Sequence, residues 1–251
     1  ISPFGVWRNS SDDPLGSDTQ AGVTNYDHLY ADILKWMRYE WIDYVTPQIY
    51  WEIGHPRADF EVLCKWWNDN AQGCRLYIGM APYKVSTESA TPAWKNPAEL
   101  PAQMEMLRKY PNISGSVFFS SKSFKRDLLG FQDSLKNHYY RYPALTPPLQ
   151  WANLIKPGPP ADLKVSGRKV SWNAPAAVPG LQLPLSYLIY LNNPEETFNP
   201  ANSLKIIGHA RQNKAEFHRK GGKKKPYSVR VTTLDRLNNE SNPAGPGKIK
   251  L

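Results

Sequence analysis

The feature that most constrains the fold is a regular alternation of strand-like and helix-like segments over residues 1–140. Four short runs rich in Val, Ile, Tyr and Phe each precede a longer stretch in which apolar residues recur at helical spacing. Because strands that alternate with helices form parallel sheets, we expect an α/β fold built from four βα units. The predicted strands cover residues 2–7, 43–51, 75–83 and 114–121.

The helices between these strands are predicted from capping residues and apolar stripes. The first covers residues 25–39 and begins with a capping box, in which Thr24 is the cap and Asp27 follows three residues on. Others are expected over about residues 58–71, from Asn96–Pro97 onward, and after the fourth strand. The inward face of the first helix is expected to carry Tyr26, Leu29, Tyr30, Ile33 and Met37.

Four such units are too few for a closed barrel. Each takes about 35 residues, close to the spacing in a (β/α)8 barrel of roughly 250 residues. The first region is therefore either a small open sheet or half of a barrel whose other half is absent.

The composition changes after Tyr140. A proline-rich stretch follows and is expected to act as a linker that packs on the first region, with Trp151 as its anchor. Beyond it, short alternating runs separated by Pro, Gly and Asn predict a small β-sandwich. We expect one domain over residues 1–157, linker included, and a second over residues 158–251. The predicted strands of the sandwich lie at 163–165, 169–172, 187–191, 204–208, 214–217 and 227–234.

The ends of the parallel strands are where a ligand is expected, since α/β folds bind ligands at the carboxyl ends of their strands. Aromatic side chains recur there beside groups that form hydrogen bonds. An aromatic ring suits the apolar face of a sugar, and the polar groups suit its hydroxyls. The predicted substrate-binding residues are Trp7, Arg8, Asn9, Gln48, Tyr50, Trp51 and Tyr83.

A structural role for these residues is the alternative. A Trp at a strand end often covers a core, and Gln48 could bond to backbone groups near Pro47, which has no N–H to donate. The recurrence over four strand ends favours a binding cleft.

Glu52 is the candidate catalytic residue, because it is the one carboxylate placed at a predicted strand end. Glycoside hydrolysis needs two carboxylates across the sugar bond, about 5 Å apart for retention and about 6.5–9.5 Å apart for inversion. Asp12, Asp13, Asp18 and Glu88 lie in loops and form no evident pair with it. This region is therefore expected to grip the substrate, with the acid–base pair elsewhere.

Other chemistries lack their motifs. There is no GxGxxG, GxxxxGK[ST] or HExxH, and the five histidines show no metal-ligand spacing, so no cofactor and no metal are expected. No apolar run approaches the roughly 18–20 residues of a membrane helix, so no transmembrane segment is expected. The chain begins with Ile1 and has no signal peptide, which suggests a processed or truncated product.

The net charge of +9 favours acidic partners. The basic run at residues 218–227 is interpreted first as a solvated hairpin tip and alternatively as a contact with acidic glycan or lipid headgroups. Nucleic acid is not expected, because no aromatic residues interleave with these cations.

Five segments in order, "ISPFGVWRN", "NYDHLYADILKW", "IDYVTPQIYW", "YIGMAPY" and "GSVFFSS", resemble the glycosyl-hydrolase-like family ten of bacterial cell-envelope proteins. The resemblance covers residues 1–151 and implies the second half of a TIM-type barrel that acts on bacterial cell-wall glycan. It implies that the acidic strand-end motif lies in the missing N-terminal half, which becomes an expected partner. It also implies an extracytoplasmic location in the cell envelope, as a lipoprotein or a periplasmic protein.

The tail resembles a fibronectin type III domain. Trp172, the run at 187–191, Tyr227 and residues 239–243 fall where that family has its core Trp, central strand, late-strand Tyr and final turn. In extracellular bacterial hydrolases such modules are usually spacers or docking units, and the resemblance implies the same here.

Three functions remain open from the sequence. The leading one is the C-terminal part of a secreted glycoside hydrolase that acts on a polysaccharide; whether this portion alone is an enzyme stays open. The second is a non-catalytic carbohydrate-binding or cell-surface adhesion protein. The third is an open α/β domain with a small-molecule substrate. A half barrel leaves sheet edges free, so it is expected to dimerise, aggregate or pair with its missing half.

Overall fold

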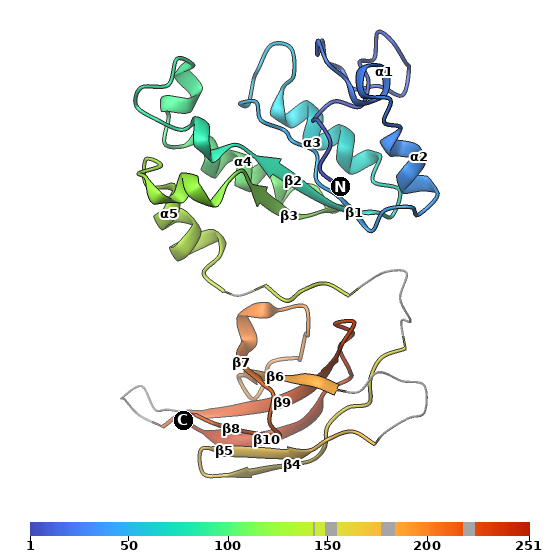
Figure 1. Ribbon diagram of the computed structural model, residues 1–251. Helices are drawn as coiled ribbons and strands as arrows, with labels where there is room; N and C mark the ends of the chain where they lie inside the picture. The colour runs from blue at the N-terminus through green and yellow to red at the C-terminus, as the bar shows by residue number, and fades with distance from the viewer. Residues whose placement is uncertain (143, 149–154, 177–183, 218–223) are drawn as a thin grey trace. The chain divides into compact units, whose positions relative to one another are not determined.

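The computed structural model describes residues 1–142, 144–148, 155–176, 184–217 and 224–251. The chain divides into two compact units, Ile1–Arg141 and Tyr142–Leu251 (Figure 1). This division lies upstream of the boundary expected after residue 157, because Leu145 already packs on the core of the second unit. Trp151, the expected linker anchor, and residues 218–223 of the basic run lie outside the described residues.

The first unit is built on a parallel sheet with the strand order β1 (Tyr44–Val45), β2 (Arg75–Met80) and β3 (Ile113–Phe118). The N-terminal segment runs beside β1: the Thr46 N–H donates to Ile1 O over 2.8 Å and the Gln48 N–H to Pro3 O over 2.9 Å. Four extended segments therefore lie side by side in chain order, all parallel, although the first is not a regular strand.

The outer side of that first segment is occupied by a side chain instead of another strand. Asn25 is fully buried, and its amide accepts from the Phe4 N–H over 3.0 Å and donates to Phe4 O over 2.8 Å and Val6 O over 2.9 Å. Helix α1 thereby caps the backbone of the first segment at its carboxyl end.

The helix predicted over residues 25–39 is two helices, α1 (Asn25–Leu29) and α2 (Ile33–Arg38). Tyr30 adopts a left-handed conformation with φ of 53° that ends α1, and its side chain is 91% exposed. Tyr26 and Leu29 are exposed as well, so the predicted inward stripe holds only for Ile33 and Met37.

The predicted capping box does not form: the Thr24 hydroxyl donates to the Asp27 carboxylate and accepts no hydrogen bond from the backbone N–H groups of α1.

The remaining helices of the first unit follow the predicted order. They are α3 (Phe60–Asp69), α4 (Glu99–Leu107) and α5 (Phe131–Ser134), with the short helices η1 (Pro82–Lys84), η2 (Pro92–Lys95), η3 (Ser121–Lys125) and η4 (Leu135–Tyr139). Strand residues such as Ile78 share one core with Leu63 of α3 and Met104 of α4. The buried indole N–H of Trp67 donates to Gly5 O over 2.7 Å and ties α3 to the first segment.

The second unit is an all-β sandwich of two antiparallel sheets. One sheet has the order β4 (Ala161–Ser166), β5 (Lys169–Asn173), β8 (Lys214–Glu216). The other has the order β10 (Ala244–Lys250), β9 (Pro226–Asp235), β6 (Pro184–Asn192), β7 (Ile206–Ala210), with the short helix η5 (Ser203–Lys205) before β7. Val170 and Trp172 of the first sheet share a core with Ile189 and Val231 of the second. The chain is thus a mixed α/β unit followed by a β unit.

None of the helices within the described ranges is long and apolar enough to cross a membrane.

Candidate functional site

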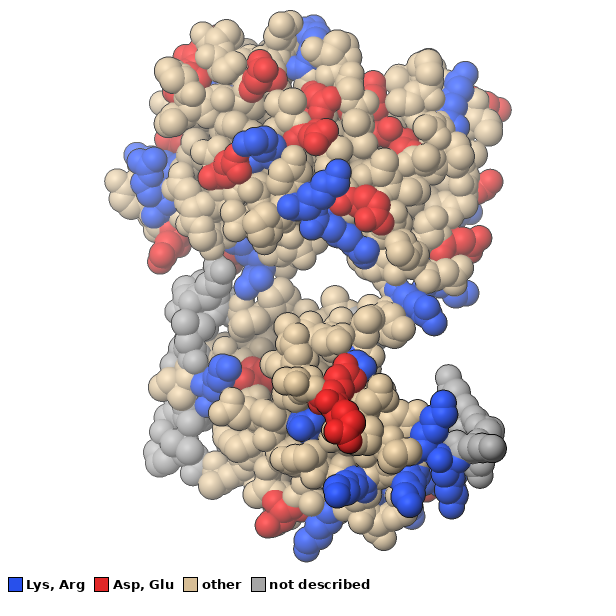
Figure 2. Space-filling view, turned by 180° about the vertical axis from the view of Figure 1, so that it is seen from behind, with Lys and Arg blue, Asp and Glu red and all other residues tan. Residues whose placement is uncertain are grey.

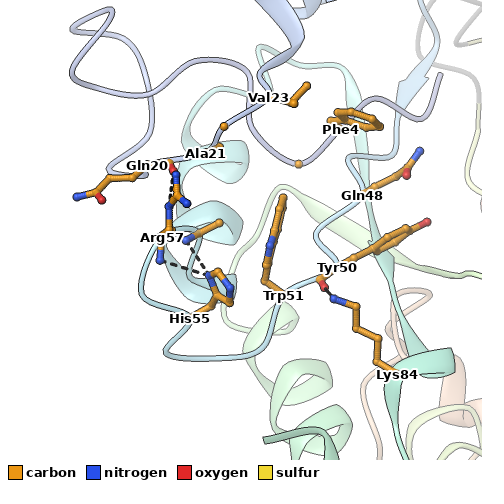
Figure 3. A pocket seen from close by; sticks show the side chains of 13 residues that line it. Phe4, Gln20, Ala21, Val23, Gln48, Tyr50, Trp51, His55, Arg57 and Lys84 are labelled. Carbon is orange, nitrogen blue, oxygen red and sulfur yellow. Dashed lines mark hydrogen bonds between the residues drawn. The ribbon is translucent and has the colours of Figure 1, made fainter. Parts of the chain in front are cut away.

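A pocket of about 470 Å³ opens in the first unit, just beyond the segment that follows β1 (Figure 3). Its walls come from four places: the N-terminal segment, the loop before α1, the strand end after β1 with the loop that leads to α3, and helix η1. The lining residues are Phe4, Gly5, Gln20, Ala21, Gly22, Val23, Gln48, Tyr50, Trp51, His55, Arg57, Ala58 and Lys84.

The aromatic side chains that line the pocket are Phe4, Tyr50 and the half-buried Trp51, and Trp51 is the central one. A Cβ placed on Gly5 would lie 2.8 Å from an atom of this ring, so Trp51 packs directly on the Gly5 backbone. The His55 ring lies beside it at 6.2 Å between centroids. In Figure 3 Trp51 stands in the middle of the pocket, with His55 and Arg57 on one side and Tyr50 on the other. One flat apolar face is thus presented to a ligand, as a sugar ring requires.

Three polar side chains of the pocket use some of their hydrogen-bonding atoms on the protein backbone and leave others free for a ligand. The Gln48 amide donates to Ser2 O over 3.0 Å, and Arg57 Nε donates to Gln20 O over 3.0 Å. His55 Nδ1 accepts from the Ala58 N–H over 3.1 Å, so in the neutral ring the hydrogen resides on Nε2. The Gln48 carbonyl oxygen, the Arg57 guanidinium tips and His55 Nε2 are then the groups that can bond to a ligand.

Lys84 contributes a second cation. Its Nζ donates to Tyr50 O and lies 5.5 Å from the centre of the Trp94 ring. Burial lowers the pKa of Lys84, and the nearby Glu52 charge opposes this effect. No Asp or Glu is among the described residues that line the pocket.

Three predicted site residues, Gln48, Tyr50 and Trp51, lie together in this pocket. Tyr83 lies next to it in an aromatic trio, with ring centroids 6.1 Å from Tyr50 and 6.0 Å from Phe119. Tyr83 is 41% and Phe119 59% exposed, so the trio extends the aromatic surface beyond the pocket. Burial, with Tyr83 nearby, raises the pKa of Tyr50, which keeps this hydroxyl protonated.

Glu52, the predicted catalytic residue, does not line the pocket. Its carboxylate accepts a hydrogen bond of 2.9 Å from the indole N–H of Trp94 in η2, because the chain turns away from the pocket after Trp51. A catalytic role for Glu52 remains a prediction.

Trp7, Arg8 and Asn9 lie outside this pocket and engage the protein itself. Trp7 is only 4% exposed and stacks on Trp66, with centroids 6.0 Å apart. Arg8 forms ion pairs of 2.8 Å with Asp13 and 2.7 Å with Asp27. These contacts hold the loop that follows the first segment.

Asn9 nevertheless acts on the pocket indirectly. Its Oδ1 accepts from the Ala21 N–H over 2.8 Å and its Nδ2 donates to Ala21 O over 3.1 Å. Because Ala21 is part of the lining, Asn9 fixes one wall of the pocket without touching its space.

Sequence reasoning missed Phe4, Arg57 and Lys84. A signal existed for Lys84, which directly follows the strand end "MAPY", and for Arg57, which lies in the loop after the strand end that supplies Trp51. Phe4 has no such signal, since it precedes its strand end.

The first unit is thus an α/β fold with a parallel sheet and an aromatic-lined pocket beyond its strand ends. Residues 1–96 match the family described as "Glycosyl hydrolase-like 10". Through its N-terminal unit the chain belongs to this family.

Two curated relatives align with this chain over more residues than the family match covers. Identity to "Glycosyl hydrolase YngK" of Bacillus subtilis (strain 168) is 44% over 171 residues, which is 67% of this chain and 33% of that protein. Identity to "Glycosyl hydrolase DigH" of Escherichia coli (strain K12) is 45% over 125 residues, 47% of this chain and 28% of that protein. The aligned part of this chain spans a third or less of each of these relatives.

Among solved structures, titin module A71 from human cardiac muscle matches with a TM-score of 0.26 and 20% identity, over 39% of this chain and 90% of that chain. A score this low carries no argument about fold.

Proposed function

We propose that the chain is the C-terminal part of a secreted glycoside hydrolase and that its first unit grips a polysaccharide. The observation that carries this is the pocket in which Trp51 presents a flat aromatic face beside the Gln48 amide and the Arg57 guanidinium. Membership in a glycosyl hydrolase-like family supports the same class of substrate.

The strand arrangement supports a second half of a (β/α)8 barrel as the origin of the first unit. In such a barrel neighbouring strands are parallel and follow chain order, as the N-terminal segment, β1, β2 and β3 do. The outer edge of β3 is one of the two edges where a missing N-terminal half would pair, and Val117 and the following Phe119 are 47% and 59% exposed there. That half would supply catalytic carboxylates that the pocket lining lacks, and Glu52 is the candidate from this chain.

The sandwich order β4-β5-β8 with β10-β9-β6-β7 supports a fibronectin type III-like module that acts as a spacer or docking unit. The proposal extends to bacterial cell-wall glycan as substrate and to the cell envelope as location, both from the sequence resemblance described above.

The second candidate is a carbohydrate-binding or adhesion protein without catalysis. The absence of Asp and Glu from the described pocket lining favours it over an enzyme that is complete within this chain.

The test is calorimetric titration of the chain with oligosaccharides released from purified bacterial cell-wall glycan. Trp51→Ala is expected to weaken binding by about 2 kcal/mol, roughly 30-fold, because it removes the central aromatic face. Trp41→Ala is the matched control, since Trp41 is 63% exposed and stacks on Tyr39 away from the pocket. Absence of binding, or equal weakening by both substitutions, would refute the pocket as the sugar site.

Catalysis is tested in the longer protein that contains this chain. Cleavage that drops in Glu52→Gln while binding persists would support Glu52 as a catalytic carboxylate. Binding without any cleavage by the intact protein would favour the second candidate.

A further inference from the structure

The charge of the molecule is distributed very unevenly between the two units. Residues 1–141 contain 15 Lys or Arg and 16 Asp or Glu, a net charge of −1. Residues 142–251 contain 16 Lys or Arg and six Asp or Glu, a net charge of +10. The basic character of the whole chain therefore comes from the second unit, since the first unit is nearly neutral.

Within the sandwich, one end gathers five exposed cations, here called the cationic end: Arg168, Lys169, Lys224, Lys225 and Lys250. The fold brings them together from three places in the chain. The Phe217 N–H donates to Arg168 O over 3.0 Å, which joins the end of β8 to the β4–β5 turn. The Lys225 and Leu251 backbones exchange hydrogen bonds of 2.7 and 3.1 Å, which join the start of β9 to the end of β10. Figure 2 shows Lys and Arg side chains crowded at the lower right of the second unit.

The cationic end is hollowed as well as charged. A cavity of about 470 Å³ is lined by Gly167, Arg168, Lys224, Lys250 and Leu251. Gly167 has a φ of 61°, which makes the tight turn that places Arg168 at the rim.

Few acidic groups neutralise this end. Lys169 pairs with Glu216 at 3.9 Å. Among the described residues, no ion pair engages Arg168, Lys224, Lys225 or Lys250. Several like charges held around one hollow create a potential that attracts a polyanion, whose binding releases condensed counterions.

The surroundings of the cationic end indicate which kind of polyanion fits. Of the exposed large hydrophobic side chains in the described part of the chain, none lies on β5, β8, β9 or β10. Within the described residues, these strands therefore offer no strongly exposed aromatic ring for the stacking of bases and no strongly exposed apolar side chain for insertion into a bilayer. The exposed Leu204 and Ile207 lie at the β7 edge, which β9 and β6 separate from β10.

We propose that the cationic end is a binding site for an anionic polysaccharide, which it recognises by charge. The site is formed by residues of the second unit alone and would dock the protein on an acidic polymer independently of what the pocket of the first unit binds.

The experiment measures binding of the chain to polygalacturonate, a polysaccharide with one carboxylate per sugar, at a series of salt concentrations. The test variant is the triple substitution Arg168→Gln, Lys224→Gln, Lys250→Gln. Its matched control is Arg211→Gln, Lys214→Gln, Arg236→Gln, which removes the same charge. Arg211 and Arg236 follow the ends of β7 and β9 at the other end of the sandwich, and Lys214 starts β8 opposite Ser171, outside the lining of the cavity. All six side chains are exposed, and circular dichroism is expected to show that both variants fold.

The expected result is salt-dependent binding that the test variant weakens about tenfold or more at low salt, with a salt slope reduced by roughly 2–3, about one for each cation removed. The control is expected to weaken binding by less than about threefold, since it changes only the long-range field. Equal losses in both variants would show a general effect of net charge and overturn the site. Failure to bind polygalacturonate, or tighter binding of double-stranded DNA or of phosphatidylglycerol vesicles lost in the same variant, would overturn the assignment to a polysaccharide.

Discussion

Two neighbouring strand ends in the first unit carry similar sequences and have opposite roles. "VWRN" ends the first segment, and its Trp7 is 4% exposed and stacked on Trp66. "IYWE" ends the second, and its Trp51 lines the pocket. The difference lies in the loop that follows, because Arg8 and Asn9 anchor residues 10–23 over the first end, whereas the chain after Trp51 turns away. An aromatic residue at a strand end becomes a ligand surface only where its own loop leaves it uncovered.

The largest expected effect separates the two tryptophans by stability. Trp7→Ala empties a buried, stacked position and is expected to lower the free energy of unfolding by about 3–5 kcal/mol. Trp51→Ala removes a half-buried ring and is expected to lower it by less than about 2 kcal/mol. Urea denaturation followed by the helical circular dichroism signal, which arises mainly from the first unit, measures both. If Trp51→Ala lowered the free energy of unfolding as much as Trp7→Ala or more, Trp51 would be a core residue like Trp7, contrary to the comparison of the two strand ends.

A smaller effect on stability and binding is expected from a substitution of Gly5, whose backbone lies against the Trp51 ring. A Cβ on Gly5 would lie 2.8 Å from both Gln48 O and the Trp51 ring, so Gly5→Ala must displace the ring. We expect a stability loss of about 1–3 kcal/mol and roughly tenfold weaker oligosaccharide binding.

Gly22→Ala is the matched control for Gly5→Ala, since Gly22 also lines the pocket but a Cβ added there would have no atom within 4 Å. Binding that persists in Gly5→Ala, or fails equally in Gly22→Ala, would show that Trp51 does not need the close approach of the Gly5 backbone.

The smallest expected effect is a change in Tm at acid pH when the Arg8–Asp27 ion pair at the end of the first segment is removed. The hydrogen bond from Arg8 lowers the pKa of Asp27. Between the folded and unfolded pKa values the unfolded chain binds more protons, so stability is fully present above the unfolded pKa and is lost as the pH falls through the folded one. Asp27→Asn is therefore expected to lower the Tm at neutral pH by a few degrees at most, because the pair is partly exposed.

This difference in Tm should shrink as the pH falls below the pKa of the Asp27 carboxyl. Asp133→Asn serves as control, because Asp133 is exposed and makes no ion pair within the described residues. A difference that is constant across acid pH would show that Asp27 acts through something other than its charge.

The sequence predicts the parallel order of the first unit because periodicity reports burial, and strands such as residues 75–80 are buried on the helix side. The sequence also predicts that Gln48, Tyr50 and Trp51 lie close together, because all three stand at the carboxyl end of the same predicted strand. It does not show that residues 25–39 break at Tyr30, because the left-handed turn there is set by the loop around it and not by the apolar spacing. Nor does it distinguish Trp7 from Trp51, because that depends on where a loop of irregular backbone folds back.

The buried amide of Asn25 has a consequence for self-association. By satisfying the N–H and C=O of Phe4, it occupies backbone groups that an added strand would need at this border of the sheet, while the border along β3 carries no such cover among the described residues. Chains that join through a single border can only meet in pairs, whereas growth into fibres needs two. A strand added at the border beside Phe4, from a second molecule or from the missing half of a barrel, would have to displace the Asn25 amide first.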